Sequence, residues 1–361
     1  MSHDARRLPK GRAAAVNPKN RFESLHAVDD FEQLDAHDEM WTEPRRVATE
    51  FLPDRALTLL RENNSPDIPF RYSLNAYRGC EHGCAYCYAR PSHETLGMNA
   101  GLDFESKILV KHDAPQLLRR ELNHPRWPVE WIAMSGVTDC YQPAERTFRL
   151  TRQLLEVLLE ARQPFEIITK NALVARDLDL LQPLAEMNLV RVNISLTSLD
   201  AELLRTLEPR TSSPQARLRA IAELSAAGVP ARVMVAPIIP GLNDHEIGTI
   251  LTAAKAAGAV GAGFVLLRLP WSVSPIFLEW LAVHRPLAKE KVEALVRDTR
   301  EGKINDPKFK SRMRGTGSYA QNITRTFELF ATKLGLRQPL PPLERSLFRP
   351  PRDTQGQGML F

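Results

Sequence analysis

The sequence predicts an α/β fold in which parallel strands alternate with helices, arranged as a partial or complete barrel. Six strand-like runs follow one another along the chain, and helical patterns of about 10 to 16 residues lie between them. Runs such as Phe165–Thr169 and Gly263–Leu269 are largely apolar, which is typical of strands covered on both faces. In barrels of this kind, functional residues lie on the loops at the carboxyl ends of the strands.

The expected elements occupy residues 71 to 269 in order. The strand-like runs are Arg71–Arg78, Glu130–Gly136, Phe165–Thr169, Val190–Leu196, Ala231–Ala236 and Gly263–Leu269. The helical patterns between them cover residues 147–162, 173–187, 213–228 and 243–258. Ser213 and Asn243 suit helix N-caps, whereas Gly228 and Gly258 suit the left-handed residue that follows a helix.

The composition divides the chain into four parts. Residues 1–45 mix charge and proline with few periodic apolar positions, so we expect a flexible basic lead-in rather than a phosphate-binding arm. The barrel is expected over residues 46–270, followed by a helical C-terminal extension over 271–336. Residues 337–361 contain five prolines and are predicted to be extended or disordered.

Charge and hydropathy exclude several classes of protein. No apolar run approaches the roughly 18 residues of a membrane span, and the first residues contain no apolar signal segment. A cytoplasmic protein with no membrane partner is therefore expected. The net charge of +5 and pI of about 9.1 are compatible with nucleic acid, but fall short of the dense basic stripe of a dedicated binder.

Three of the four cysteines lie within eight residues. Cys80, Cys84 and Cys87 form a C-x3-C-x2-C motif on the loop that leaves the first strand, and Cys140 stands alone. Clustered thiols in a cytoplasmic chain indicate a metal or redox site. Gly79 next to Cys80, together with a second glycine at position 83, would allow the tight backbone turns that such a loop requires.

The missing fourth ligand decides between the kinds of site. An iron–sulfur cluster held by three cysteines keeps one iron open for another molecule, and the motif favours this interpretation. One alternative is a structural zinc site that uses Cys140 or His82 as its fourth ligand, although zinc sites usually consist of paired C-x2-C units. The other alternative is a chance grouping of thiols, which the low cysteine content disfavours.

The motif and its context resemble a known family. An aromatic residue, Tyr86, precedes the third cysteine on the first βα loop, a pattern similar to that of the radical S-adenosylmethionine (SAM) superfamily. The segments NAYRGCEHGCAYCYAR, TDCYQPAE, ITKNALVARDLDLL, NISLTSLD and APIIPGLND resemble the spore photoproduct lyase-like branch of that superfamily. The resemblance covers residues from about 72 to 269 and continues through the helical segment that contains RMRGTGSYA (312–320).

The resemblance implies a partial (β/α)6-type radical SAM barrel and two cofactors. A [4Fe–4S] cluster would be held by Cys80, Cys84 and Cys87, and its open iron would bind SAM. Reductive cleavage of SAM would give a radical that abstracts hydrogen from the substrate. A one-electron reductant of the flavodoxin or ferredoxin type is implied as a partner.

The resemblance also suggests residues that contact SAM. Tyr86 is expected near the adenine, and Thr138, Lys170 and Ser195 follow or end the second, third and fourth strands. Lys170 would face the SAM carboxylate as a point charge. For these last three residues, the alternative is an ordinary polar side chain at a strand end. Residues 134–137 replace the usual glycine-rich motif for the SAM amino group, so that contact is unassigned.

Cys140 raises the question of repair chemistry. Spore photoproduct lyases carry a hydrogen-donating cysteine on the loop after the second strand, but Gly136 occupies the matching position here. Cys140 is therefore either a hydrogen donor at a shifted site or a small buried residue. This departure makes thymine-dimer repair a weak expectation.

The combined prediction is a radical SAM enzyme with an unidentified substrate, for which repair-like action on DNA is one candidate. The alternatives are a non-catalytic iron–sulfur or zinc scaffold that recruits partners, and a radical SAM enzyme acting on a protein or small molecule. The final residues Gln357–Phe361 resemble the peptide by which repair proteins dock on the sliding clamp, with an inert tail as the alternative.

Overall fold

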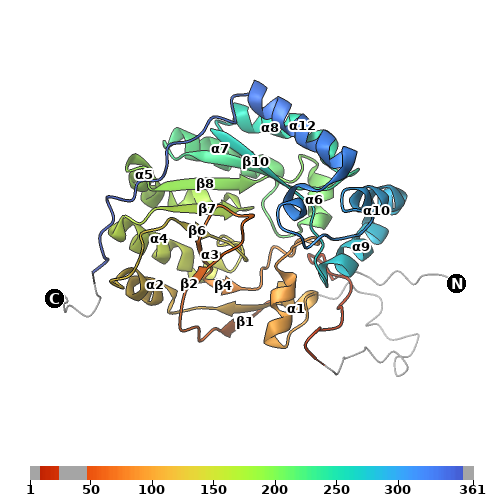
Figure 1. Cartoon of the computed structure of the whole chain (residues 1–361). Helices are drawn as coiled ribbons and strands as arrows, with labels where there is room; N and C mark the ends of the chain where they lie inside the picture. The colour runs from red at the N-terminus through yellow and green to blue at the C-terminus, as the bar shows by residue number, and fades with distance from the viewer. Residues whose placement is uncertain (1–8, 24–46, 353–361) are drawn as a thin grey trace.

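A computed structural model of the chain describes residues 9–23 and 47–352 (Figure 1). Its centre is a seven-stranded sheet in the order β10-β9-β8-β7-β6-β3-β2. Six of these strands run parallel, and β2 (Leu60–Glu62) adds an antiparallel edge. The parallel strands are β3 (Tyr72–Leu74), β6 (Ile132–Met134), β7 (Phe165–Thr169), β8 (Val190–Ser195), β9 (Ala231–Ile238) and β10 (Gly261–Leu266).

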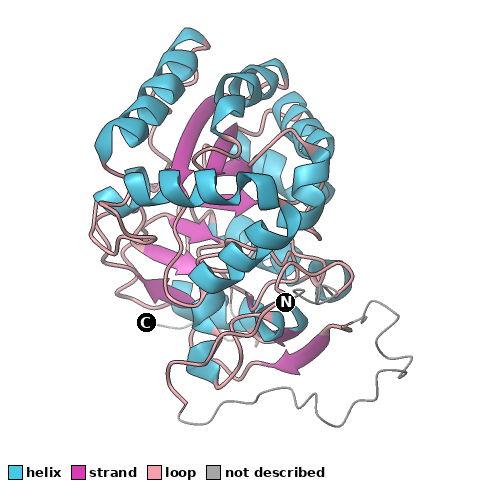
Figure 2. Ribbon diagram, turned by 90° about the vertical axis from the view of Figure 1, so that its right-hand side faces the viewer, coloured by secondary structure: helices cyan, strands magenta, loops and turns pink. Residues whose placement is uncertain are grey.

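The prediction of an α/β partial barrel is confirmed. Within the described ranges, β10 and β2 do not pair, so the sheet remains open on one side. Figure 2 shows the strands inside a layer of helices. That layer contains α2 (Ala114–Leu122), α4 (Leu150–Ala161), α5 (Leu178–Glu186), α7 (Pro214–Ala226), α8 (Ile247–Ala256) and α12 (Gly317–Lys333). Aliphatic side chains of the strands and helices meet in one continuous core, which fixes the positions of the strand ends.

Most predicted helix ends are confirmed. The hydroxyl of Ser213 accepts a hydrogen bond from the Ala216 N–H at 3.3 Å, which caps α7. Gly228 and Gly258 adopt φ angles of +74° and +96°, the left-handed conformation expected after a helix. Asn243 occupies the N-cap position of a 3-10 turn that precedes α8, but its side chain bonds to Ile239 and Pro237 instead of capping the turn.

The sequence prediction missed a second, three-stranded sheet in the order β1-β5-β4. It contains β1 (Glu50–Pro53), β4 (Tyr77–Arg78) and β5 (Lys107–Val110). The predicted strand over residues 71–78 is in fact two strands, β3 and β4, that belong to different sheets. The break falls at Asn75, whose side-chain oxygen accepts hydrogen bonds from the N–H groups of Val137 and Thr138.

Shorter helices surround the barrel mouth and form the C-terminal extension. Near the mouth lie η2 (Arg90–Ser92), η3 (Glu94–Leu96), α1 (Leu102–Ser106), α3 (Glu145–Phe148), η4 (Ala172–Asp177), α6 (Ala201–Leu207) and η5 (Asp244–Glu246). After β10 follow α9 (Val273–His284), η6 (Pro286–Ala288), α10 (Lys289–Asp298) and α11 (Ser311–Arg314), before α12 packs against α8 (Figure 1). A second apolar cluster joins α6, α9 and α10 to the residues around the cysteine motif.

The lead-in contains an ordered segment, so the expectation of flexibility is wrong for residues 9–23. Ala13 and Ala14 are fully buried, and their N–H groups donate to the Glu105 carboxylate at 3.2 and 3.0 Å. Glu105 is itself buried in α1, and it needs these donors to offset its lost hydration. Residues 1–8 and 24–46 lie outside the described ranges.

The described part of the proline-rich tail, residues 337–352, is extended as predicted, and it is held against the barrel rather than disordered. They cross the amino ends of β8, β7 and β6 and bond to the loops there. The Glu344 N–H donates to the Asn188 carbonyl at 3.0 Å, and the Arg349 N–H donates to the Ala161 carbonyl at 2.9 Å. These backbone bonds fix a segment that proline keeps from forming a helix. The clamp-like motif Gln357–Phe361 lies outside the described residues.

None of the helices in the described ranges has the length and apolar character that a membrane span requires.

Candidate active site

The three clustered cysteines lie on the loop after β4, on the carboxyl side of the barrel strands. All three are free thiols, and Cys80 and Cys84 are 7% exposed. Gly79 and Gly83 have φ angles of +79° and +63°. A Cβ atom at Gly79 would lie 2.9 Å from His93, and one at Gly83 would lie 2.7 Å from the Glu105 carboxylate. The tight turns expected from the sequence therefore require glycine at both positions.

A buried arginine fixes the shape of this loop. Arg90 is fully buried, and its guanidinium donates to the carbonyls of Gly83 and Cys84. The same group pairs with the Glu105 carboxylate at 2.5 Å, and both side chains are inaccessible to solvent. Because a buried ion pair is stable only when its remaining donors are also satisfied, these carbonyl contacts determine the path of the loop.

A second buried network holds Tyr86, which lies between the last two cysteines. Its hydroxyl donates to the Glu208 carboxylate and lies 3.3 Å from the Thr197 hydroxyl. Glu208 pairs with Arg217, and both side chains are inaccessible to solvent. Burial alone would raise the pKa of Glu208, but the positive charges of Arg217 and Lys170 hold it well below its usual range. Glu208 is therefore ionised beneath the cysteine loop.

The segment that carries Glu208 contacts the cysteine loop at two further points. The Ala85 N–H donates to the Leu207 carbonyl at 3.0 Å. Arg210 pairs with Glu81 at 2.9 Å, directly after the first cysteine. The end of α6 and the residues directly after it therefore hold the cysteine loop at Glu81, Ala85 and Tyr86.

Of the residues predicted to contact SAM, Tyr86 lies on the cysteine loop, and the other three lie at or after the carboxyl ends of β6, β7 and β8. The Lys170 ammonium lies 5.8 Å from the centre of the Tyr86 ring, so the structure brings these two together. The Thr138 hydroxyl donates to the Tyr77 carbonyl at 3.1 Å. Ser195 is the last residue of β8 and is buried. No hydrogen bond or ion pair joins Thr138 or Ser195 to Lys170 among the described residues.

Asp139 links the β6 loop to the cysteine loop. Its carboxylate lies 3.3 Å from Nδ1 of His82 and accepts the Lys170 backbone N–H at 2.7 Å. Burial alone would lower the pKa of His82, but the charges of Asp139 and Cys80 raise it. The second ring nitrogen of His82 lies 3.3 Å from the Asn171 amide. Both ring nitrogens therefore have partners within the protein.

The donor set fits a multi-iron cluster better than a single zinc ion. Among the described residues, no three His, Cys, Asp or Glu side chains converge closely enough to bind one metal ion. A cubane binds each cysteine through a different iron, so its ligands need not converge at one point. Burial raises the pKa of the Cys84 and Cys87 thiols. The next largest contribution comes from the charge of Glu208 for Cys84 and from that of Cys80 for Cys87. Bound iron would reverse this effect and stabilise the thiolates.

Cys140 is 4% exposed and belongs to the main apolar core. Its N–H donates to the Ser135 hydroxyl at 2.8 Å, and its carbonyl accepts from Thr151 at 2.6 Å. Burial raises the pKa of its thiol well above the usual value, and Asp139 adds to this effect. Cys140 is thus a protonated, buried thiol. Neither it nor His82 forms the closed zinc site considered from the sequence.

The comparison with protein families settles the class. A family model of the radical SAM superfamily matches residues 74–254, which include the whole cysteine motif and strands β6 to β9. The chain belongs to the radical SAM superfamily. Membership of this superfamily implies a [4Fe–4S] cluster and SAM as cofactors, and the three clustered cysteines are the residues that would hold the cluster.

Several relatives of this radical SAM protein cover much of its length. An uncharacterized protein of Mycobacterium tuberculosis is 39% identical over 253 residues, which are 70% of this chain and 74% of the relative. An uncharacterized protein of Methanocaldococcus jannaschii is 33% identical over 184 residues, covering 51% and 66%. The radical SAM Nα-GlyT isomerase of Pseudomonas phage M6 is 24% identical over 218 residues, covering 60% and 42%.

Solved structures of spore photoproduct lyase share the fold of this radical SAM protein. The lyase complexed with dinucleoside spore photoproduct has a TM-score of 0.55 and 17% identity, covering 79% of each chain. A mutant of the lyase with the same ligand has a TM-score of 0.57 and 15% identity, covering 79% of this chain and 78% of the lyase. At this level of identity, the likeness is one of fold.

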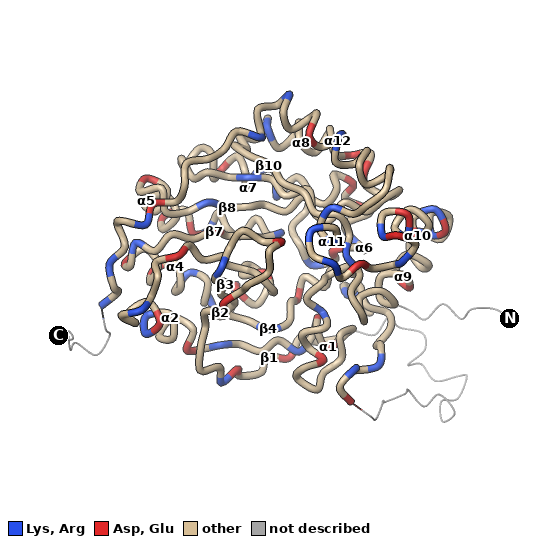
Figure 3. The backbone as a smooth tube through the Cα atoms, viewed as in Figure 1, with Lys and Arg blue, Asp and Glu red and all other residues tan. Residues whose placement is uncertain are grey.

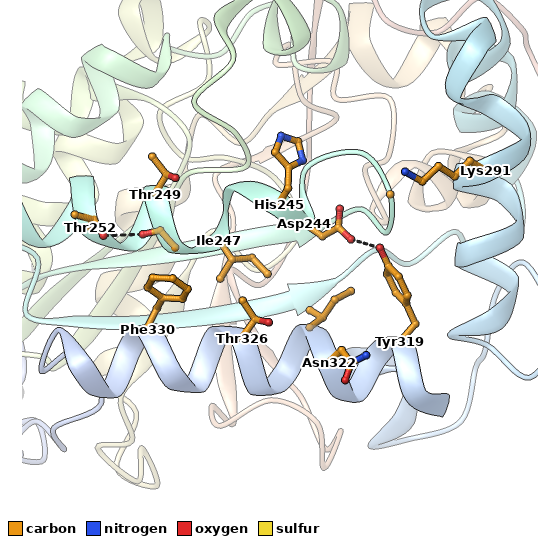
Figure 4. A pocket seen from close by; sticks show the side chains of 13 residues that line it. Asp244, His245, Ile247, Thr249, Thr252, Lys291, Tyr319, Asn322, Thr326 and Phe330 are labelled. Carbon is orange, nitrogen blue, oxygen red and sulfur yellow. Dashed lines mark hydrogen bonds between the residues drawn. The ribbon is translucent and has the colours of Figure 1, made fainter.

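A hollow of about 820 Å³ lies away from the cysteine motif. It is lined by residues of α8 and α12, some of which Figure 4 shows. Tyr319 donates to the Asp244 carboxylate at one end of this groove, and Lys291 lies near them. None of the three cluster cysteines lines the groove, so we assign the radical chemistry to the cysteine loop instead.

Sequence reasoning missed the residues that hold the motif in place. Glu208 contacts Tyr86 from 122 positions later in the chain, and Arg90 pairs with Glu105 across a segment that was not expected to be helical. No spacing rule connects such pairs. The sequence offers one hint of their burial. The charged residues lie next to apolar residues in the segments LLRTLEPR (203–210) and CYARPS (87–92).

Proposed function

We propose that this radical SAM protein is an enzyme that cleaves SAM reductively and abstracts a hydrogen atom from a separate substrate. When bound, the cluster and SAM supply the 5′-deoxyadenosyl radical, and the protein supplies ligands, orientation and exclusion of water. The observation that carries the proposal is the buried loop with three free thiols, shaped by Gly79 and Gly83, at the carboxyl side of a parallel barrel. One relative is itself named an isomerase, which favours an enzyme over a scaffold.

The contact between Lys170 and Tyr86 supports their roles toward SAM. Lys170 forms no ion pair among the described residues, although its charge acts on the buried Glu208, so its ammonium can bind a ligand carboxylate beside the Tyr86 ring. The Tyr86 ring, which is fixed by Glu208, would lie beside the adenine. Thr138 and Ser195 would complete the rim from the adjacent strand ends.

We further propose DNA as the substrate, in a repair-like reaction, with electrons from a flavodoxin- or ferredoxin-type partner. The fold likeness to spore photoproduct lyase and the basic pI of about 9.1 support this assignment. The burial of Cys140 favours a packing role over hydrogen donation, and hydrogen return would then come from another group or from the adenosyl product.

The test is anaerobic reconstitution followed by incubation with SAM and dithionite. The wild-type protein should bind about four irons and form 5′-deoxyadenosine, whereas Cys84→Ala should do neither. Candidate DNA substrates deuterated at defined positions should then transfer label into 5′-deoxyadenosine. A fully loaded cluster that leaves SAM intact would refute the enzymatic proposal and favour the scaffold.

A further inference from the structure

A surface of arginines and exposed aromatic rings begins one residue after the last cluster cysteine. Tyr88 is 51% exposed, and its hydroxyl donates to the Gly136 carbonyl on the loop after β6. The Arg268 guanidinium lies 5.7 Å from the centre of the Tyr88 ring. Arg268 follows the edge strand β10, so this contact spans the open side of the barrel next to the cluster loop.

The surface continues from Arg268 to α11. Nη1 of Arg268 lies 3.4 Å from the sulfur of Met313. The Arg312 guanidinium lies 4.5 Å from the centre of the Phe309 ring, which is 56% exposed. Three residues after Arg268, the exposed Trp271 ring stacks with the Arg21 guanidinium, which lies 4.2 Å from the ring centre. Figure 3 shows that basic residues gather around α11.

The positive charge of this surface is only partly compensated. Arg312 pairs with Asp67, but Arg268 and Arg314 have no carboxylate partner among the described residues. The like charge of Arg312 adds to burial in lowering the pKa of Arg268. The Arg268 and Arg312 guanidinium groups repel each other, and an anion bound between them would reduce this repulsion.

Buried donors behind the surface also lack partners. The Nε atoms of Arg268 and Arg300 and the hydroxyl of Ser272 have no hydrogen-bond partner within the described part of the chain. Arg300 is 1% exposed, and it donates to the carbonyls of Leu267 at 2.6 Å and Ser311 at 2.9 Å. Arg300 therefore joins the loop after β10 to α11. It keeps a buried charge there, and no carboxylate in the described part of the chain forms an ion pair with it.

We propose that Tyr88, Arg268, Trp271, Phe309 and Arg312 form a binding surface for single-stranded nucleic acid that delivers a nucleotide to the cluster loop. Guanidinium groups bind phosphates, and exposed rings between them provide faces on which bases stack. An acidic peptide would use the arginines but would gain little from the rings. The inference rests on the proposed function only in placing the reaction at the adjacent cysteines.

The experiment measures binding rather than turnover. Anaerobically reconstituted full-length protein is titrated into a fluorescein-labelled 12-nucleotide oligothymidylate at several salt concentrations, and anisotropy is recorded. Wild-type affinity should fall with salt. The double variant Arg268→Gln/Arg312→Gln should bind at least tenfold more weakly and reduce the slope of log K against log salt by about 1.4, or about 0.7 for each lost phosphate contact.

A second variant separates stacking from charge and guards against misfolding. Phe309→Ala removes an exposed ring that makes no hydrogen bond through its side chain. It should weaken binding by about tenfold and leave the salt slope unchanged. Arg219→Gln on the exposed face of α7 is the matched control and should bind as the wild type does. Iron content and far-UV circular dichroism should be the same in all variants.

Three results would overturn the inference: no binding by the wild type, binding unaffected in both the double variant and Phe309→Ala, or equal affinity for a polyglutamate peptide of the same length. SAM cleavage without oligonucleotide binding would overturn this inference alone. Oligonucleotide binding without SAM cleavage would refute the proposed function and leave the surface in place.

Discussion

The Tyr86 hydroxyl and the Glu208 carboxylate share a hydrogen bond in the buried layer beneath the cysteine loop. Tyr86 lies between two cluster ligands, and Glu208 is held in turn by Arg217, whose side chain is also inaccessible to solvent. The position of the cluster ligands therefore depends on an ion pair from a distant part of the chain.

Glu208→Gln should destabilise the protein and lower its iron content. The substitution leaves the Arg217 charge buried without its partner, which typically costs about 3–5 kcal/mol. The measurement is chemical unfolding followed by circular dichroism, with an iron assay on the same preparations. Glu208→Gln/Arg217→Met is the matched control, and it should recover part of the loss because no uncompensated charge remains. Unchanged stability in the single variant would contradict the assigned role.

Cys84→Ala should abolish iron binding, whereas Cys140→Ala should retain about four irons per chain. Cys84 belongs to the glycine-shaped loop, whereas Cys140 is packed in the main core. Iron and zinc are measured together after anaerobic reconstitution. Stoichiometric zinc without iron in the wild type would contradict this prediction.

Cys140→Ala should cleave SAM and form product as the wild type does, because the native thiol is buried and protonated. The measurement compares the yields of 5′-deoxyadenosine and substrate-derived product. A variant that cleaves SAM but accumulates a trapped or rearranged substrate radical would instead identify Cys140 as the hydrogen donor.

Lys170→Met should weaken SAM binding by about tenfold, the effect of losing one charge-assisted hydrogen bond. Lys170→Arg keeps the charge and should lose less. Binding is followed by the change in the electron paramagnetic resonance spectrum of the reduced cluster as SAM is added. Lys255→Met on the exposed face of α8 is the control and should match the wild type. Equal affinity in Lys170→Met and the control would remove Lys170 from the SAM site.

Lys111→Met should raise the melting temperature at pH 7 and have little effect near pH 10. Lys111 is 7% exposed and donates to the Asn75 carbonyl at 2.7 Å. Burial lowers its pKa to about 8, despite an opposing contribution from Asp54.

The direction of this pH dependence follows from the number of protons bound at Lys111 in the folded and unfolded states. Between pH 8 and the unfolded value near 10.5, the unfolded chain holds more protons at Lys111, so wild-type stability rises with pH across this window. Below it, the charged lysine costs roughly 3 kcal/mol, which Lys111→Met avoids. Thermal unfolding of both proteins at pH 7, 8.5 and 10 tests this prediction. A difference in melting temperature that is independent of pH would contradict it.

The sequence by itself determined most of the parallel strands, the helices between them and the position of the cysteine motif. Hydrophobic periodicity depends only on neighbouring residues, so Phe165–Thr169 is recovered as β7 with identical bounds. The spacing of Cys80, Cys84 and Cys87 is also local, because one short loop must present all three thiols to the same cluster.

Only the tertiary structure decided which distant groups meet around that loop. Residues 9–23 and 337–352 have flexible or extended sequences, yet they are fixed by carbonyls and carboxylates of the barrel that no local pattern reveals. The same holds for the pairing of Tyr86 with Glu208 and for the approach of Arg268 to Tyr88. These contacts form only when the packed core brings distant loops together. A short stretch of sequence does not specify which distant loops will meet.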